Sequence, residues 1–413
     1  MEMIISKKCI LNGEVEVSSS KNAILPVLAA SLLTEGKVVI NNAPNIRDVK
    51  IITELIKQLG IIVDSKQKSL IFNGDINDNN PPYELVSQIR ASFLVMGPLL
   101  ARRGQVKVAL PGGCAIGTRP IDLHLKGFEA LGARITLSCG DVIAQARKLR
   151  GNHIYLDYPS VGATENIIMA ATMAEGTSYI ENAALEPEIV DLANFINSMG
   201  GKISGAGSNI IKITGVKNLQ ATDYTPIPDR IEAGTFMVAT AATGGQVKIN
   251  NVIPEHLKAI TAKLIETGAE IEEGENYIQI TRKGNIKPVY IKTLPYPGFP
   301  TDMQAQFMAY LCCTDGSSII TESVFENRFM HVQELLRMGA KIKTEGRTAI
   351  IKGTDELTGA AVKATDLRAG AALLIAGLTA RGPTMITESC HIDRGYEDIV
   401  NKLNKLGANI SRN

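Results

Sequence analysis

The chain of 413 residues repeats one pattern six times. An apolar residue or Thr followed by a helix-ending glycine recurs at Gly60, Gly132, Gly200, Gly268, Gly339 and Gly407. A second glycine, placed between an apolar helix and a strand, recurs at Gly36, Gly104, Gly176, Gly245, Gly316 and Gly382. Successive members of both series are about 70 residues apart, and a fixed period indicates repeated structural units. The chain therefore predicts six copies of one supersecondary unit.

Each unit has the pattern of a strand, an amphipathic helix, a hairpin and a further helix. The further helix, as in NAILPVLAASLLTEG and AGAALLIAGLTARG, is apolar on nearly all faces, which is typical of a helix buried on every side. The Pro-bearing stretch TDYTPIPDR (residues 222–230) reads as an extended crossover between units three and four. We therefore predict an α/β fold of two similar domains, each with three repeated units and the apolar helices inside. A cleft between two such domains is a usual place for a ligand.

The composition excludes several classes of protein. Apolar residues make 45% of the chain, charged residues 21%, and the formal net charge is +1, so a dedicated nucleic-acid binder is not expected. The N-terminal MEMIISKKCI has no secretory pattern, and no apolar run reaches the roughly 20 residues of a membrane span. These features predict a cytoplasmic protein that does not interact with a membrane. Six cysteines without a CxxC pair and five scattered histidines predict reduced thiols and no metal site.

Polar residues gather where the apolar helices begin. Helix N-termini offer unpaired N–H groups and a partial positive charge, so several together, with Lys and Arg added, predict an anion site. Capping and surface charge are the alternative for any single helix. The usual phosphate-binding glycine loops are absent. The residues in question are Lys21, Asn22, Arg90, Thr164, Glu165, Asn166, Asp229, Arg230, Asp302, Asp366 and Arg368.

Two segments carry residues suited to catalysis. The glycine-rich LPGGCAIGTRP (residues 110–120) contains Cys114 and Arg119, and a nearby cation lowers the pKa of a thiol. Cys114 is therefore a candidate nucleophile or proton donor, with an inert buried thiol as the alternative. In YPGFPTDMQAQ (residues 296–306), Asp302 precedes a buried helix. It is either a helix N-cap or a general base.

The strings SSSKNAILPVLAASLL, LPGGCAIGTRPIDLHLKG, SVGATEN, PDRIEAGTF, YPGFPTDMQAQ, ENRFMHVQEL and DRGYED together resemble the UDP-N-acetylglucosamine 1-carboxyvinyltransferase family over essentially the whole chain. The resemblance implies transfer of enolpyruvyl from phosphoenolpyruvate to the 3′-hydroxyl of UDP-N-acetylglucosamine, with release of phosphate. This reaction is the first committed step of bacterial peptidoglycan synthesis, and it needs neither a metal nor a redox cofactor. The resemblance also implies the inside-out α/β barrel of enolpyruvyl transferases, with two three-repeat domains.

The resemblance assigns roles to individual residues. Cys114 is implied to protonate C3 of phosphoenolpyruvate and to be alkylated by fosfomycin. Asp302 is implied to accept the proton of the 3′-hydroxyl. Lys21, Arg119 and Arg394 are implied to surround the phosphate and carboxylate of phosphoenolpyruvate, with Asn22 beside them. The positions implied to line the sugar nucleotide are Arg90, Arg119, Pro120, Ile121, Asp122, Leu123, Asp302 and Val324.

The resemblance further places residues 21–228 in an N-terminal domain that carries the Cys114 loop. Residues 1–20 and 229–413 form a C-terminal domain that carries Asp302 and Arg394, and the active site lies in the cleft between the domains, which close on substrate. Tyr158 and Leu185 stand where some relatives have basic side chains, so the contacts to uridine and the outer phosphate are open.

Two other functions remain open at this point. A 5-enolpyruvylshikimate 3-phosphate synthase would share the fold and the phosphoenolpyruvate chemistry, but its GNAGTxxR phrase is absent. A catalytically silent paralogue would bind UDP-N-acetylglucosamine as a sensor or regulator and release no phosphate.

Overall fold

Six apolar helices, one for each repeat, form the centres of two separate cores. The computed structural model describes residues 2–110, 117 and 120–412. These divide into an N-terminal unit (residues 19–110 and 120–227) and a C-terminal unit (residues 2–18 and 228–412), each with its own hydrophobic cluster. The central helices are α1 (Lys21–Ala30), α4 (Met96–Arg103) and α6 (Val161–Ala171) in the N-terminal unit, and α8 (Arg230–Thr243), α10 (Gln304–Leu311) and α12 (Leu367–Thr379) in the C-terminal unit.

Side-chain caps fix the start of four central helices. Ser20, Ser160, Asp229 and Asp366 each accept a hydrogen bond from a backbone N–H in the first turn of α1, α6, α8 and α12. Two others are extended at the N-terminal side by short 3-10 helices, η2 (Arg90–Val95) before α4 and η4 (Thr301–Met303) before α10. The polar residues at these helix starts therefore act in part as caps.

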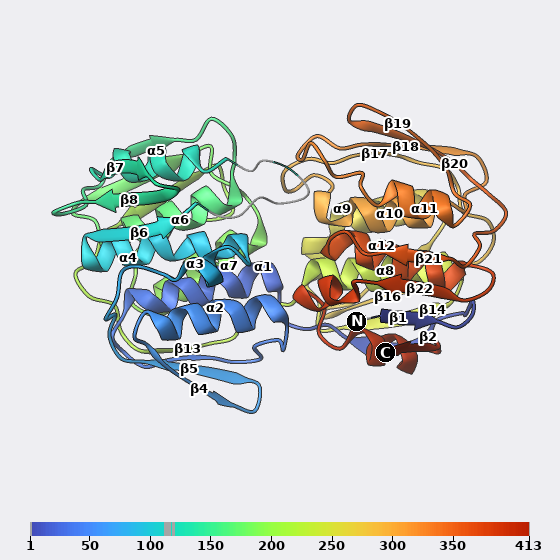
Figure 1. Ribbon diagram of the computed structural model, residues 1–413, viewed down its shortest axis with the longest axis horizontal. Helices are drawn as coiled ribbons and strands as arrows, with labels where there is room; N and C mark the ends of the chain where they lie inside the picture. The colour runs from blue at the N-terminus through green and yellow to red at the C-terminus, as the bar shows by residue number, and fades with distance from the viewer. Residues whose placement is uncertain (1, 111–116, 118–119, 413) are drawn as a thin grey trace. The chain divides into compact units, whose positions relative to one another are not determined.

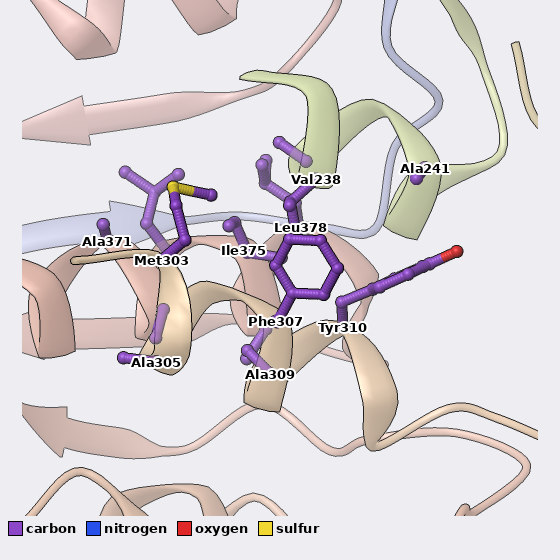
Figure 2. Packing of buried hydrophobic residues seen from close by; sticks show 14 of the residues in the cluster. Val238, Ala241, Met303, Ala305, Phe307, Ala309, Tyr310, Ala371, Ile375 and Leu378 are labelled. Carbon is purple, nitrogen blue, oxygen red and sulfur yellow. The ribbon is translucent and has the colours of Figure 1, made fainter. Parts of the chain in front are cut away.

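The core of the C-terminal unit shows why small residues are frequent in these helices. In Figure 2, Phe307 of α10 lies among Val238 of α8 and Ile375 and Leu378 of α12. Phe307 also contacts Tyr310 edge-on, with ring centroids 6.2 Å apart. Alanines on the same helices lie around these large side chains. The alternation of large and small residues lets three helices pack closely.

Amphipathic helices cover the central ones in each unit (Figure 1). In α2 (Arg47–Gln58), for example, Val49, Ile52 and Leu55 are buried while Lys50 and Lys57 are exposed. The remaining outer helices are α5 (Asp122–Ala130), α7 (Pro187–Ser198), α9 (Lys258–Glu266), α11 (Val332–Arg337) and α13 (Ile399–Lys405). Each outer helix is followed in the sequence by a glycine with positive φ, for example Gly60 with 105° and Gly407 with 104°. The first series of repeated glycines thus consists of helix-ending residues, as predicted.

Three sheets belong to the N-terminal unit. Their strand orders are β13 (Thr222–Tyr224), β3 (Val38–Ile40), β5 (Ser69–Asn73), β4 (Ile62–Lys66); then β6 (Gln105–Ala109), β8 (Asp141–Gln145), β7 (Arg134–Ser138); and β11 (Ile203–Ser204), β12 (Ile210–Thr214), β10 (Thr177–Glu181), β9 (His153–Tyr155). A one-turn helix, α3 (Tyr83–Val86), precedes η2.

The C-terminal unit has three four-stranded sheets. Their orders are β15 (Glu270–Glu273), β16 (Tyr277–Thr281), β14 (Gln246–Asn250), β2 (Asn12–Glu16); then β17 (Tyr290–Lys292), β18 (Ser317–Thr321), β20 (Thr348–Lys352), β19 (Lys341–Glu345); and β21 (Ala361–Lys363), β22 (Thr384–Thr387), β1 (Glu2–Ile5), β23 (Ile410–Arg412).

Short strands add a parallel pairing to most of the sheets. Five sheets contain a strand that pairs parallel with the strand after the central helix: β13, β9, β2, β17 and β21. The sequence pattern did not predict these, because three to five residues show little periodicity. In the last sheet, β1 lies between β22 and β23 and completes the sixth repeat.

The predicted α/β fold is confirmed, with two units and the apolar helices inside each. Among the described strands, the sheets remain six separate layers rather than one closed barrel. The two segments that join the units run beside each other: Ser20 N donates to Ile227 O at 2.8 Å, and Asp229 N donates to Ser18 O at 2.9 Å. Over the described part of the chain, no helix has the length and apolar character needed to cross a bilayer.

Candidate active site

Lys21 is held at the start of a central helix in the N-terminal unit. It is the first residue of α1, directly after the cap Ser20, whose hydroxyl accepts from Ala23 N at 3.3 Å. Its Nζ lies 3.4 Å from Oδ2 of Asp48, a buried residue of α2. Asn22 follows Lys21 in the same first turn. Lys21 and Asn22 therefore lie at the positive end of a helix, next to one buried carboxylate.

The structure also brings together the described sugar-nucleotide residues of this unit, Arg90 and residues 120–123. Arg90, the first residue of η2, directs Nη2 to the backbone oxygen of Pro120 at 3.5 Å. Ile121 precedes α5, whose first residues are Asp122 and Leu123. The start of η2 therefore lies beside the start of α5.

His124 of α5 packs against Phe93 of η2 and so connects these two helices. It is buried, its Nδ1 lies 3.1 Å from Nδ2 of Asn166, and its ring meets Phe93 edge-on at 5.2 Å. Burial, and then the charge of Arg90, lower the pKa of His124 to about 3. A neutral His124 can accept the Asn166 N–H, so it has a structural part that the sequence did not reveal.

The polar residues of α6 are structural. Thr164 Oγ1 accepts from Ala184 N at 3.1 Å, and Asn166 Oδ1 accepts from Gly97 N at 2.8 Å. Glu165 is buried, and burial together with Glu188 and Glu186 raises its pKa well above the ordinary value. This helix start therefore contributes buried hydrogen bonds and offers no cationic side chain to an anion.

In the C-terminal unit, two arginines hold the carboxylate of Asp302. Arg328 Nη2 donates to Oδ1 at 2.8 Å, and Arg368 Nη2 donates to Oδ2 at 2.9 Å. Both guanidinium groups are buried, while the Asp302 side chain is 25% exposed. Burial acts to lower the pKa of Arg368, but the charges of Asp302, Tyr396 and Asp229, together with the hydrogen bond to Asp302, outweigh it and the pKa is raised. We call Arg328, Asp302 and Arg368 the arginine clamp.

The clamp distinguishes the two expectations for Asp302. Neither η4 nor α10 begins with a side-chain cap, so Asp302 is not an N-cap. An ionised carboxylate is a hydrogen-bond acceptor only, and the two guanidinium groups fix the direction in which its oxygens point. Asp302 can therefore accept a hydrogen bond from a hydroxyl group while its orientation is fixed.

Val324 is tied to the same segment through Glu322. The buried Glu322 carboxylate accepts from Thr301 Oγ1 and from Val324 N, both at 2.8 Å. Thr301 directly precedes Asp302, so the structure brings these two predicted residues together. Arg394 ends the 3-10 helix η5 (Ser389–Arg394), two residues before Tyr396, and Tyr396 contacts the clamp through Arg368.

The sequence missed several residues of this arrangement. Arg328 and Tyr396 lie in the strings ENRFMHVQEL and DRGYED, which contribute to the resemblance but gave these two residues no individual role. Glu322 had no signal beyond its place after a strand. Cys114 and Arg119 lie outside the described residues, and their expected roles remain predictions.

Comparison with known proteins gives a consistent answer. The family model described as EPSP synthase (3-phosphoshikimate 1-carboxyvinyltransferase) matches residues 5–403. UDP-N-acetylglucosamine 1-carboxyvinyltransferase 1 of Caldanaerobacter subterraneus subsp. tengcongensis is 57% identical over 411 residues, covering 100% of this chain and 99% of the relative. UDP-N-acetylglucosamine 1-carboxyvinyltransferase 2 of Carboxydothermus hydrogenoformans is 58% identical over 414 residues, with coverage of 100% and 99%.

Solved structures support the fold. The enolpyruvyl transferase NikO from Streptomyces tendae aligns with a TM-score of 0.90 at 24% identity, covering 99% of this chain and 98% of that one. EPSP synthase from Acinetobacter baumannii aligns over 100% of both chains with a TM-score of 0.77 at 18% identity. These likenesses show the architecture, whereas the full-length identities above 50% show the family. The chain therefore belongs to the enolpyruvyl transferases and, among them, to the UDP-N-acetylglucosamine 1-carboxyvinyltransferase family.

Proposed function

We propose that this protein transfers the enolpyruvyl group of phosphoenolpyruvate to the 3′-hydroxyl of UDP-N-acetylglucosamine and releases phosphate. The observation that carries this proposal is the identity of 57% and 58%, over the full length, with two curated relatives named for that activity. The product serves bacterial peptidoglycan synthesis, and the reaction takes place in the cytoplasm.

Asp302 accepts the proton of the 3′-hydroxyl as its oxygen forms a bond to C2 of phosphoenolpyruvate. The clamp supports this role, since two buried guanidinium groups fix the orientation of the carboxylate. A general base requires a distance of about 3 Å to the hydroxyl, so its orientation matters as much as its presence.

Cys114 supplies the proton to C3, which gives a tetrahedral adduct that still carries phosphate on C2. Loss of a proton from C3 and departure of phosphate then restore the double bond. Lys21, Arg119 and Arg394 stabilise the charge on the phosphate and carboxylate. The position of Lys21 at the N-terminus of α1 supports its part, because the partial positive charge of the helix adds to that of the ammonium group.

The sugar nucleotide contacts Arg90, the segment 119–123, Asp302 and Val324, with Asn22 beside the reacting centre, in a cleft between domains 21–228 and 1–20 plus 229–413. The hydrogen bond between Arg90 and the Pro120 carbonyl supports a shared site for the N-terminal group of residues. The Glu322 contacts support the same for Asp302 and Val324. Fosfomycin inhibits by alkylating Cys114.

The test is the release of phosphate from phosphoenolpyruvate with UDP-N-acetylglucosamine, with shikimate 3-phosphate or without acceptor, each in the presence and absence of fosfomycin. Release only with the sugar nucleotide, abolished by fosfomycin, is expected. Release with shikimate 3-phosphate would identify the other enolpyruvyl transfer reaction. Folded protein that binds UDP-N-acetylglucosamine but releases no phosphate would be the silent paralogue.

A further inference from the structure

The hydroxyl group of Tyr396 joins three helices beneath Asp302. It accepts from Arg368 Nη1 at 3.1 Å and from Gln306 Nε2 at 3.3 Å, and it lies 2.9 Å from Thr235 Oγ1. Thr235 belongs to α8, Gln306 to α10 and Arg368 to α12, so each repeat of the C-terminal unit contributes one contact. Tyr396 itself is 2% exposed.

The direction of these hydrogen bonds follows from the donors available. Thr235 Oγ1 donates its only proton to the carbonyl oxygen of Ile231 at 2.7 Å, so the proton between Thr235 and Tyr396 comes from the phenol. Tyr396 therefore donates one hydrogen bond and accepts two, which uses the full capacity of a phenol hydroxyl. Phenylalanine could make none of the three.

Both donors to this hydroxyl also bind Asp302. Arg368 uses Nη1 for Tyr396 and Nη2 for the Asp302 carboxylate. Gln306 Nε2 also donates to the backbone oxygen of Asp302, at 2.8 Å. The phenol thus holds Nη1 of Arg368 while Nη2 of Arg368 holds the Asp302 carboxylate. Through Gln306, the phenol is also connected to the Asp302 backbone.

We propose that Tyr396 is a positioning residue that holds Arg368, and through it the Asp302 carboxylate, in the orientation required for enolpyruvyl transfer. The proposal rests on the proposed function for its kinetic consequence, and on the hydrogen bonds of the C-terminal unit for its structural one. Without the hydroxyl, Arg368 Nη1 loses its acceptor in a buried place, and such a group moves to find another, whereas Gln306 Nε2 keeps Asp302 O at 2.8 Å and Thr235 Oγ1 at 3.3 Å. A small displacement of a reacting group can reduce turnover by up to about a hundredfold.

Several charged side chains surround the arginine clamp and Tyr396. Arg328 and Arg368 face Asp302 directly, from the segment before α11 and from α12. Asp229, the cap of α8, acts on both Arg368 and Tyr396. Asp366, the cap of α12, and Arg328 act on the buried His331. A weaker Arg368 contact leaves the Asp302 charge less compensated, so Asp302 would titrate at higher pH.

The test compares Tyr396→Phe with Tyr310→Phe in the full-length protein. Tyr310 is a matched control, because it is buried in the same unit and its hydroxyl makes one hydrogen bond, 2.8 Å to Thr267, at the other end of α10. Two quantities are measured: kcat and KM for phosphate release, and the pH titration of the Asp302 carboxyl carbon by ¹³C NMR, assigned with Asp302→Asn. For Tyr396→Phe we expect kcat to fall about tenfold with KM nearly unchanged, and Asp302 to titrate at higher pH. Tyr310→Phe should change neither quantity.

A second variant keeps the inference testable if Tyr396→Phe does not fold. Thr235→Val retains the phenol but removes the acceptor of its proton, and it should alter kcat and the Asp302 titration in the same direction. Equal effects of Tyr396→Phe and Tyr310→Phe on kcat, with an unchanged Asp302 titration, would overturn the inference. If the wild-type protein releases no phosphate, the proposed function fails, while the Asp302 titration still decides whether Tyr396 positions the clamp.

Discussion

Arg368 donates a hydrogen bond to Asp302 across 66 residues of sequence, with Nη2 and Oδ2 2.9 Å apart. The two residues lie at the starts of central helices in successive repeats. Because the repeats place these helix starts next to each other, a carboxylate from one repeat meets a guanidinium group from the next. The repeat architecture itself therefore generates the paired charges of the candidate site.

Asp302→Asn is expected to reduce phosphate release at least about a hundredfold, since an amide cannot take up the 3′-hydroxyl proton. The amide N–H₂ would also face one of the two guanidinium donors, so unfolding should require about 1–3 kcal/mol less free energy. Steady-state kinetics and urea unfolding measure the two effects. The exposed Asp355→Asn is the control and should match wild type in both. Activity near wild type in Asp302→Asn would rule out Asp302 as the base.

Cys114→Asp should retain enolpyruvyl transfer but lose sensitivity to fosfomycin. A carboxyl group can donate the proton to C3, but it lacks the thiolate that the epoxide alkylates. A carboxyl group is ordinarily protonated only at and below about pH 4. Turnover of the variant should therefore be favoured at lower pH than that of wild type. Inhibition assays across pH test both points. Cys390→Ser, which removes another thiol, should remain sensitive, and retained inhibition of Cys114→Asp would identify a different target.

The stability of the N-terminal unit should decrease between about pH 4 and pH 7 because of Asp191. Burial raises its pKa to about 7, although Tyr224 donates to its Oδ1 at 2.7 Å. The folded state therefore binds a proton that the unfolded state has released above about pH 4. The free energy of unfolding falls by up to about 1.4 kcal/mol per pH unit over this window and then levels off.

Asp191→Asn removes this titration and keeps an oxygen for the Tyr224 hydroxyl. Urea unfolding at pH 5 and pH 8 should show a smaller loss of stability in the variant than in wild type. Glu165 changes stability in the same direction in both proteins, so the difference between them isolates Asp191. Equal pH dependence of the two proteins would contradict the assigned pKa.

A circular permutant should fold and remain active. Strands β1 and β23 are antiparallel neighbours, with Met3 opposite Arg412, so residues 412 and 2 can be joined by a short glycine-rich linker. New ends between Lys283 and Gly284 fall in an exposed segment outside the strands. Circular dichroism and phosphate release should match the parent protein. A permutant opened within β14, at the centre of its sheet, is the control that should fail to fold.

The sequence by itself determined the number of repeats and the two kinds of helix. The glycine series at Gly60 and its equivalents marks helix ends because a residue with positive φ is needed there, and this requirement is local. The all-apolar pattern of windows such as residues 369–380 indicated burial, and this signal is local too. Such signals depend on neighbours within one or two helical turns, so a single sequence contains them.

Only the tertiary structure decided which charges meet. Asp302 is paired with Arg328 and Arg368, and Tyr396 completes the arrangement, although the repeat period relates only Asp302 to Arg368 and no spacing links Arg328 or Tyr396 to them. It likewise placed β1 between β22 and β23, since a strand of four residues pairs with whichever edge the folded chain presents. A buried charge needs a partner in space rather than in sequence, and long-range packing supplies that partner.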